Sequence, residues 1–294
     1  MELALIAVPF HLGRERIGTG LGPERLLRAS IGSELASQGH TVNIEKVRYP
    51  TNIERDEVSA IAEINALLAQ GVRRALGRGG FPLVLAGDCN ASLGTLAGME
   101  TRPVGVIWLD AHGDFNTPET STSGFLDGMV LAMVMGLCHR AIWTSLGGLP
   151  IRGWQIVHIG GRAFDEGEKE RLMSDGVRVV TASQLKQVGP TTSLRPLLSA
   201  LRAQVRDIYL HVDLDVLDPV EGRANKYAAP DGLSLRDLGC VIRLVAEAFE
   251  IKAAALTAYD PACDGEGRAL DSGIRVIHTL VDTVAQKSYE REFD

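Results

Sequence analysis

The feature that most constrains the fold is a repeated alternation between short apolar runs and longer segments with apolar residues at helical spacing. An example of the helical spacing is Leu238, Ile242, Val245 and Phe249. Repeated strand–helix–strand units predict an α/β fold, with a mostly parallel eight-stranded sheet and helices on both faces. The eight predicted strands are residues 3–9, 41–47, 82–87, 104–110, 155–161, 177–182, 207–213 and 253–258.

Composition narrows the class of protein. No linker or repeat divides the 294 residues, so we predict a single domain over 1–294. The net charge of −7 gives no basic field for nucleic acid or anionic lipid. No charge-free apolar stretch approaches the roughly 18 residues of a membrane span. The first residues, with an acid at Glu2 and no basic region, do not read as a signal peptide. We therefore expect a cytoplasmic protein without nucleic-acid or membrane partners.

Clusters of acidic residues follow three of the predicted strands. Their sequences are GDCN (87–90), DAHGDFN (110–116) and DLDVLDP (213–219). In a parallel sheet the carboxyl ends of the strands meet along one edge, and ligands bind there. We therefore expect the three clusters to lie together.

The clusters have the composition of a metal site. Alternation along a strand would place Asp110, His112 and Asp114 on one face, and would likewise pair Asp213 with Asp215. Buried ionised carboxylates are costly without positive charge, and neither cluster contains Lys or Arg. Divalent cations are therefore the simplest positive partner for these carboxylates. Carboxylates with one imidazole suit Mn²⁺ better than Zn²⁺, while Fe, Co and Ni stay open.

The alternative to a metal site is a structural role for each acid. A single Asp after a strand is usually a helix cap or a turn residue, and we assign that role to Asp88 and Asp218. It explains two separate clusters poorly. His158 and His211 lie on predicted strands without matched partners, so we expect them to be buried core histidines.

The three motifs closely resemble the metal motifs of the arginase/agmatinase (ureohydrolase) family, and the resemblance extends to Tyr259-Asp260-Pro261. It implies one α/β domain that holds two Mn²⁺ ions bridged by a hydroxide, which attacks the central carbon of a guanidine group. By the same resemblance the metal ligands are Asp110 and Asp213, bridging both ions, Cys89 and Asp114 on one ion, and His112 and Asp215 on the other.

Four positions depart from the family pattern. Cys89 stands where the first motif usually has His; a thiolate can bind a divalent metal, although the change could also empty that site. Asp127 replaces a His thought to move protons, and it either takes over that role or faces water. Ala258 replaces a Glu that pairs with the guanidinium, and Tyr227 stands where arginases have Thr. Asp114 and Asp127 are the catalytic candidates.

The amino-acid end of the family's substrate site is retained by resemblance. Asn116, Ser121 and Ser123 match the residues that bind the α-carboxylate. Asp165 and Glu168 match the acids that bind the α-ammonium, although acids are common at the start of any helix. The expected partner is a small-molecule substrate that is an amino acid.

A retained amino-acid end and an altered head-group end point to Nω-hydroxy-L-arginine, whose head group is less basic than a guanidine. The chain thus resembles the branch of the family that hydrolyses this compound to hydroxyurea and L-ornithine in antibiotic biosynthesis. The alternatives are an arginase or another guanidino- or formimino-acid hydrolase, and a non-catalytic protein that binds an amino acid. We favour a monomer, because SYEREFD leaves little material for the tail of the family's trimers; a trimer stays possible.

Overall fold

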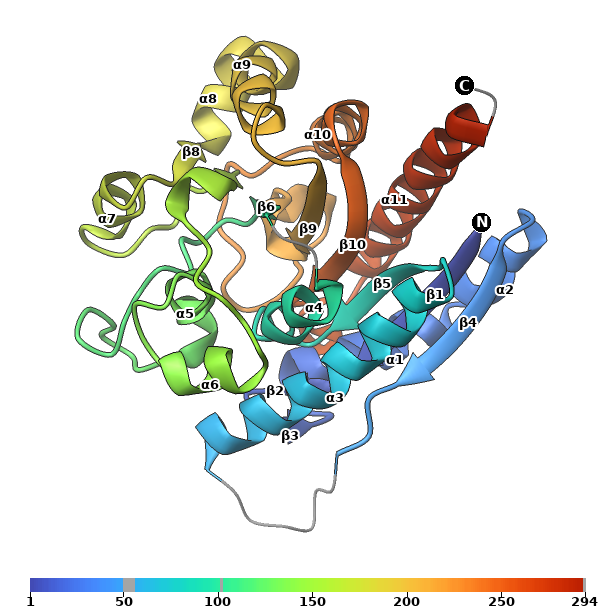
Figure 1. Ribbon diagram of the computed structural model, residues 1–294, viewed down its shortest axis with the longest axis horizontal. Coiled ribbons are helices and arrows are strands. Elements are labelled where there is room, and N and C mark those ends of the chain that lie inside the picture. The colour runs from blue at the N-terminus through green and yellow to red at the C-terminus, as the bar shows by residue number, and fades with distance from the viewer. Residues whose placement is uncertain (50–55, 101–102, 293–294) are drawn as a thin grey trace.

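A computed structural model describes residues 1–49, 56–100 and 103–292 (Figure 1). Its main sheet has eight strands in the order β4-β1-β5-β10-β9-β6-β7-β8, and every neighbouring pair is parallel. Each predicted strand is present. The strands are β1 (Glu2–Val8), β4 (Thr41–Lys46), β5 (Phe81–Ala86), β6 (Val104–Leu109), β7 (Ile156–Ile159), β8 (Arg178–Val180), β9 (Asp207–Asp213) and β10 (Glu250–Thr257).

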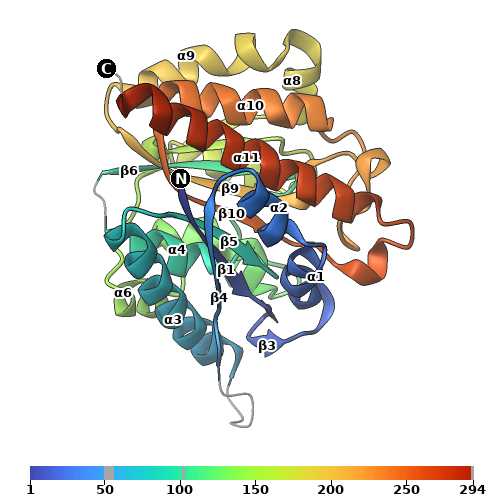
Figure 2. The same ribbon diagram turned by 90° about the vertical axis from the view of Figure 1, so that its right-hand side faces the viewer.

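Helices cover both faces of the sheet, as predicted (Figure 2). One face carries α1 (Gly22–Arg28), α2 (Ile31–Ser37), α8 (Ala182–Val188), α9 (Pro190–Arg202), α10 (Leu235–Ala248) and α11 (Arg268–Glu292). The other carries α3 (Glu57–Gly77), α4 (Ala91–Met99), α5 (Val130–Val134), α6 (Arg140–Ser145) and α7 (Glu168–Ser174). None of the helices in the described ranges is long and apolar enough to cross a membrane.

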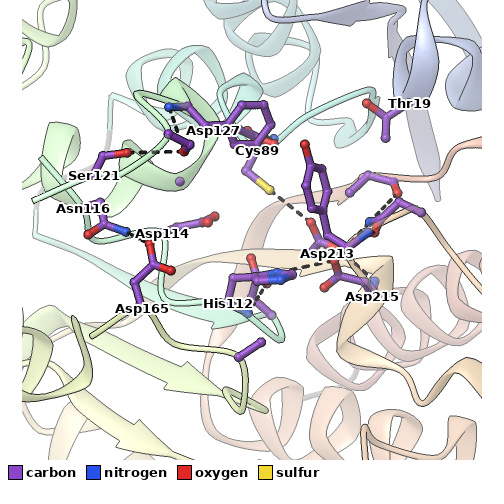
Figure 3. Close-up of a pocket in the computed structure, with 18 of the residues that line it drawn as sticks. Thr19, Cys89, His112, Asp114, Asn116, Ser121, Asp127, Asp165, Asp213 and Asp215 are labelled. Carbon is purple, nitrogen blue, oxygen red and sulfur yellow. Dashed lines mark hydrogen bonds and ion pairs between the residues drawn. The ribbon is translucent and has the colours of Figure 1, made fainter. Parts of the chain in front are cut away.

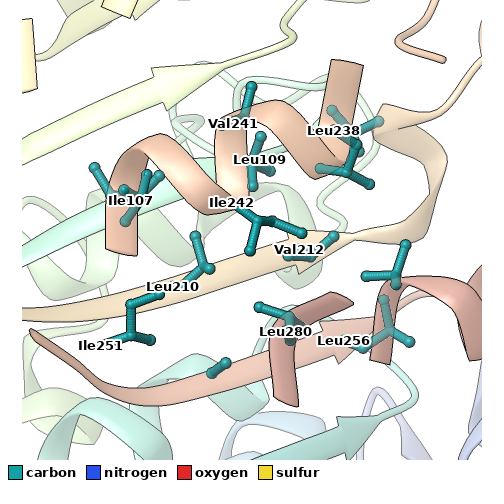
Figure 4. Packing of buried hydrophobic residues seen from close by; sticks show 14 of the residues in the cluster. Ile107, Leu109, Leu210, Val212, Leu238, Val241, Ile242, Ile251, Leu256 and Leu280 are labelled. Atoms are coloured by element: carbon teal, nitrogen blue, oxygen red, sulfur yellow. The ribbon is translucent and has the colours of Figure 1, made fainter. Parts of the chain in front are cut away.

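Successive side chains of the central strands enter two separate cores. On β6, Ile107 and Leu109 pack on one side of the sheet, while Val106 and Trp108 pack on the other. Figure 4 shows the first side, where the strand residues meet the apolar faces of α10 and α11. Burying each such side chain contributes about 1.5–3 kcal/mol to stability. The strands are therefore apolar on both faces, which explains their uninterrupted apolar runs.

Short elements outside the main sheet are not predicted by the sequence. Two-residue strands β2 (Phe10–His11) and β3 (Arg14–Glu15) form an antiparallel hairpin, which is too short to show a periodic pattern. Six 3-10 helices lie in the connections: η1 (Gly18–Leu21), η2 (Leu126–Met129), η3 (Gly153–Gln155), η4 (Leu214–Val216), η5 (Pro219–Glu221) and η6 (Pro261–Cys263).

The strand order determines which loops meet. β5 and β6 are consecutive strands in the sequence, but in the sheet β10 and β9 lie between them. The carboxyl ends of β5, β10, β9 and β6 are therefore neighbours at the centre of one edge. This is the position at which open parallel sheets bind ligands.

Candidate metal centre and active site

A cavity of about 740 Å³, counting its open mouth, lies at this edge of the sheet. Its lining includes every residue proposed for the site from the sequence: Cys89, Asp110, His112, Asp114, Asn116, Ser121, Ser123, Asp127, Asp165, Glu168, Asp213 and Asp215. Residues from widely separated parts of the chain thus share one pocket (Figure 3).

Cys89 lies in the turn between β5 and α4, with its side chain only 2% exposed. Its thiol donates a hydrogen bond to Asp213 Oδ2 at 3.2 Å. Its backbone N–H donates to Asp127 Oδ1 at 2.7 Å. The preceding Asp88 accepts a bond from the N–H of Leu12 at 2.6 Å, which fits the structural role expected for it.

The side chains of the second motif, DAHGDFN, come together through a backbone turn and not through the alternation of a strand. β6 ends at Leu109, and the backbone turns through the motif: Asp110 accepts from the N–H of His112 at 2.7 Å, and Asp114 has a φ of 49°. The prediction that Asp110, His112 and Asp114 share a strand face is wrong, because none of them belongs to the strand. The turn still brings His112 Nδ1 to 3.4 Å from Asp110 Oδ1.

The third motif also leaves its strand early. β9 ends at Asp213, whose Oδ1 accepts from the N–H of Asp215 at 2.8 Å and so caps the 3-10 helix η4. The predicted alternation of Asp213 and Asp215 is therefore also wrong. Asp215 Oδ2 lies 3.5 Å from His112 Nδ1 and accepts from Asn225 Nδ2 at 3.0 Å.

No Lys or Arg is among the described residues that line the pocket. Burial, reinforced by neighbouring carboxylates, raises the pKa of both Asp114 and Asp213 well above the usual range for aspartate. Burial and nearby aspartates also raise the pKa of the Cys89 thiol. Asp114 Oδ2 is buried, and no described residue forms a hydrogen bond with it. Excess negative charge and an unpaired buried oxygen are the conditions that a bound divalent cation relieves.

Two groups of donor atoms are close enough to hold a cation. Asp110, His112 and Asp215 form one group, and Cys89, Asp110 and His211 form the other, with the donor atoms of each group within 4.8 Å of one another. Burial opposes protonation of His112, but Asp215 and Asp110 outweigh it and raise the His112 pKa to about 9. His211 is buried, as predicted, and desolvation lowers its pKa to about 3.

A polar network lies at the opposite end of the pocket. Asn116 Nδ2 donates to Asp165 Oδ2 at 2.7 Å. The buried Glu168, the first residue of α7, accepts from the N–H of Phe115 at 2.9 Å and from that of Asp165 at 3.0 Å. The exposed Asp165 therefore keeps more freedom to meet a ligand than Glu168 does. Ser121 and Ser123 lie beside this network with their hydroxyls 3.5 Å apart.

The four positions that differ from the family pattern also line the pocket. Asp127 is half-buried, and one of its oxygens accepts from the backbone N–H groups of Cys89 and Asn90, so it does not simply face water. Ala258 has a φ of 64°, and its carbonyl accepts from Asn225. Tyr227 is 43% exposed, with its ring edge-on to His112 at 6.5 Å between centroids.

Several lining residues were not proposed from the sequence, among them His11, Thr19, Phe125 and Asn225. They come from segments outside the three motifs and carry no local signal. His211 is not part of the lining, but one of its ring nitrogens lies near donor atoms of Cys89 and Asp110. For His211 a signal existed, because it precedes Asp213 by two residues on a strand and so shares its face.

Comparison with known proteins agrees with the fold and the pocket. The Arginase family model matches residues 1–282. The chain belongs to the arginase family. It is 32% identical over 291 residues to the arginase of Bacillus caldovelox, covering 95% of this chain and 97% of that one. It is 31% identical over 288 residues to the arginase of Bacillus subtilis, with the same coverage.

Solved structures give the same result. A crystal structure of arginase from Bacillus subtilis superposes with a TM-score of 0.86 at 30% identity, covering 96% of this chain and 98% of that one. Entamoeba histolytica arginase in complex with L-ornithine superposes with a TM-score of 0.85 at 25% identity, covering 95% and 98%. This arginase-family chain is accordingly a metal-dependent hydrolase of amidino C–N bonds. The family uses a binuclear manganese centre, and the pocket offers candidate groups for one.

Proposed function

We propose that this enzyme binds two Mn²⁺ ions and hydrolyses Nω-hydroxy-L-arginine to hydroxyurea and L-ornithine. The observation that carries the proposal is that each acid in the pocket either is a proposed metal ligand or already accepts a hydrogen bond within the protein. Seven acids line it: Asp110, Asp114, Asp127, Asp165, Glu168, Asp213 and Asp215.

Apart from the proposed metal ligands, none of these acids offers two free oxygens to a guanidinium at the head-group end, because Asp127 already uses Oδ1 for the backbone N–H groups of Cys89 and Asn90. Four of them belong to the proposed metal ligands, Asp127 and Glu168 accept bonds from backbone N–H groups, and Asp165 lies at the amino-acid end. The methyl group of Ala258 offers no charge. Arginine's guanidinium is always protonated and calls for a two-oxygen contact with a carboxylate. An N-hydroxyguanidine is less basic and can enter this pocket uncharged.

The amino-acid end supplies the other half of the specificity. We assign Asn116, Ser121 and Ser123 to the α-carboxylate. Asp165 pairs with the α-ammonium, and Glu168 positions it through the Asp165 N–H and through Asn116. These contacts orient the substrate so that its head group points toward the acid cluster.

The proposed cation ligands are Cys89, Asp110, His112, Asp114, Asp213 and Asp215. When bound, two divalent cations lower the pKa of a shared water and make hydroxide available near neutral pH. Asp114 Oδ2, which has no partner among the described residues, is placed to take the proton and return it to the leaving nitrogen. Asp127 holds the turn that carries Cys89 and Asn90, so its catalytic contribution is to positioning.

The test is product analysis with purified Mn²⁺-loaded protein. We expect ornithine and hydroxyurea from Nω-hydroxy-L-arginine, and Asp165→Asn should raise KM with little change in kcat. No ornithine from that substrate would overturn the proposal. The second candidate is hydrolysis of L-arginine itself, because the relatives compared above are arginases; ornithine with urea as the faster reaction would favour it.

A further inference from the structure

His211 lies on β9, two residues before Asp213. Its side chain is completely buried. A ring nitrogen of His211, the thiol sulfur of Cys89 and a carboxylate oxygen of Asp110 all lie within 4.8 Å of one another. Three electron-pair donors thus converge in the interior.

The orientation of the imidazole is fixed on several sides. The ring stacks on Trp108, its partner across the β6–β9 ladder, with centroids 3.6 Å apart and planes 13° apart. Nδ1 lies 3.0 Å from Ser92 Oγ and 3.2 Å from the hydroxyl of Tyr209. Ring rotation would break both contacts.

The other nitrogen, Nε2, is linked to Cys89 through the hydroxyl of Thr257. Nε2 lies 3.5 Å from Thr257 Oγ1, and the same hydroxyl lies 3.5 Å from Cys89 Sγ. The hydroxyls of Ser92 and Tyr209 can accept the Nδ1–H proton, which leaves the lone pair on Nε2. A metal-binding histidine has this arrangement, with one nitrogen donating to a fixed partner and the other free for the ion.

We propose that His211 is a metal ligand and that its Nε2 binds the cation held by Cys89 and Asp110. Imidazole with thiolate is a softer donor set than carboxylates alone and suits Co²⁺ well, which makes Co²⁺ a suitable probe. The inference shares with the proposed function only the presence of a cation at Cys89. It does not depend on the identity of the substrate.

A first experiment uses the unaltered protein. In the ¹H NMR spectrum of the Co²⁺-loaded enzyme, the N–H proton of each ligating imidazole gives an exchangeable, strongly shifted signal. We expect signals from two histidines, His112 and His211. A signal from His112 alone would overturn the proposal, and this result needs no variant to fold.

A second experiment measures Co²⁺ affinity in variants by titration of the visible absorption. His211→Gln should weaken binding at the Cys89 position by about tenfold or more and remove one of the two shifted N–H signals. Tyr209→Phe is the matched control: it removes one hydroxyl that contacts Nδ1 but keeps Nε2, and both shifted N–H signals should persist. Because Ser92 Oγ still lies 3.0 Å from Nδ1, its effect on affinity should be smaller than that of His211→Gln.

The outcomes separate the two claims. Equal affinity and equal spectra for His211→Gln and the unaltered protein would show that His211 is only a core residue. Failure to hydrolyse Nω-hydroxy-L-arginine, with His211-dependent Co²⁺ binding intact, would refute the proposed substrate and leave the ligand assignment standing.

Discussion

Glu168 serves the fold and the pocket with the same carboxylate. It is buried, and its two oxygens accept bonds from the N–H groups of Phe115 and Asp165 and from the side chain of Asn116. The segment after the DAHGDFN motif is thereby fixed to the start of α7. Burial raises the pKa of Glu168, while the N–H donors of Phe115 and Asp165 and the charge of Arg171 favour its charged form.

This arrangement predicts a stability loss for Glu168→Gln. The amide of glutamine would turn N–H donors toward a backbone N–H that needs an acceptor. We expect the free energy of unfolding to fall by about 1–3 kcal/mol, measured by urea denaturation. The control is Glu166→Gln, at an exposed position two residues earlier, which should change stability by less than about 0.5 kcal/mol. Equal effects of the two substitutions would contradict the account.

The metal-binding candidates could be predicted from the sequence because burying an ionised carboxylate without a positive partner is strongly unfavourable in free energy. Several acids directly after apolar strands therefore indicate a site, and this reasoning led to Asp110, Asp213 and their neighbours. The local path could not be read in the same way. Asp114 adopts a φ of 49°, and Asp215 lies in a 3-10 turn. The carbonyl of Asp114 accepts from the N–H of Leu131, and the turn at Asp215 is capped by Asp213. Neither contact leaves a periodic pattern in the sequence, so the simple alternation failed.

At the scale of elements, α4 reaches the site through close contact with α3. A Cβ at Gly98 would lie 2.6 Å from Val72 Cβ and 2.7 Å from the carbonyl oxygen of Ala69. Only glycine allows this approach. Because α4 begins directly after Cys89 and Asn90, its distance from α3 also determines where the thiol lies.

We therefore expect Gly98→Ala to destabilise the protein by about 1–3 kcal/mol through overpacking, although alanine is the better helix former by about 1 kcal/mol. Gly77→Ala, at the end of α3, is the matched control, because its Cβ would meet nothing within 4 Å. That substitution should stabilise by roughly 0.5–1 kcal/mol. Denaturation curves measure both, and a stabilising Gly98→Ala would contradict the close packing.

The elements themselves were largely predictable. Eight predicted runs gave eight strands, and for the central strands the reason is that burial on both faces needs continuous apolar sequence. The edge strand β4 is largely exposed and less apolar. The order of the strands in the sheet was not predictable, since the insertion of β10 and β9 between β5 and β6 follows from packing across the whole chain. The β2–β3 hairpin, of two residues per strand, leaves no periodic signal.

At the scale of the whole molecule, part of the acidic surplus of 7 charges is concentrated inside the pocket. In the metal-free protein His112 provides the compensating charge. Burial opposes its protonation, but Asp215 and Asp110 raise its pKa from 6.5 to about 9. The protonated histidine thus stands in for part of the charge that a cation supplies.

This predicts how the stability of the metal-free protein depends on pH. A base whose pKa is raised by folding contributes stability that is complete below pH 6.5 and is lost as the pH rises through about 9. The free energy of unfolding should therefore fall between these values by about 1–3 kcal/mol. Urea denaturation of chelator-treated protein measures it. His112→Asn should flatten the profile, and an unaltered protein that grows more stable over this range would contradict the account.

The assembly of the protein stays a prediction. We expect a monomer, with a trimer as the alternative. Light scattering coupled to size-exclusion chromatography decides between them: a mass near the chain's 31.6 kDa would support the monomer, and three times that mass would contradict it.

The central claim is that the pocket accepts the less basic head group of Nω-hydroxy-L-arginine because, apart from the proposed metal ligands, no acid at the head-group end offers two free oxygens to a guanidinium. The most direct test is kcat/KM for Nω-hydroxy-L-arginine and for L-arginine, measured on one preparation of Mn²⁺-loaded enzyme whose metal content is known. We predict a kcat/KM at least about tenfold higher for the hydroxylated substrate than for L-arginine. A tenfold difference is the effect expected when arginine lacks one charge-assisted hydrogen bond in the transition state. An equal or higher value for L-arginine would contradict the account.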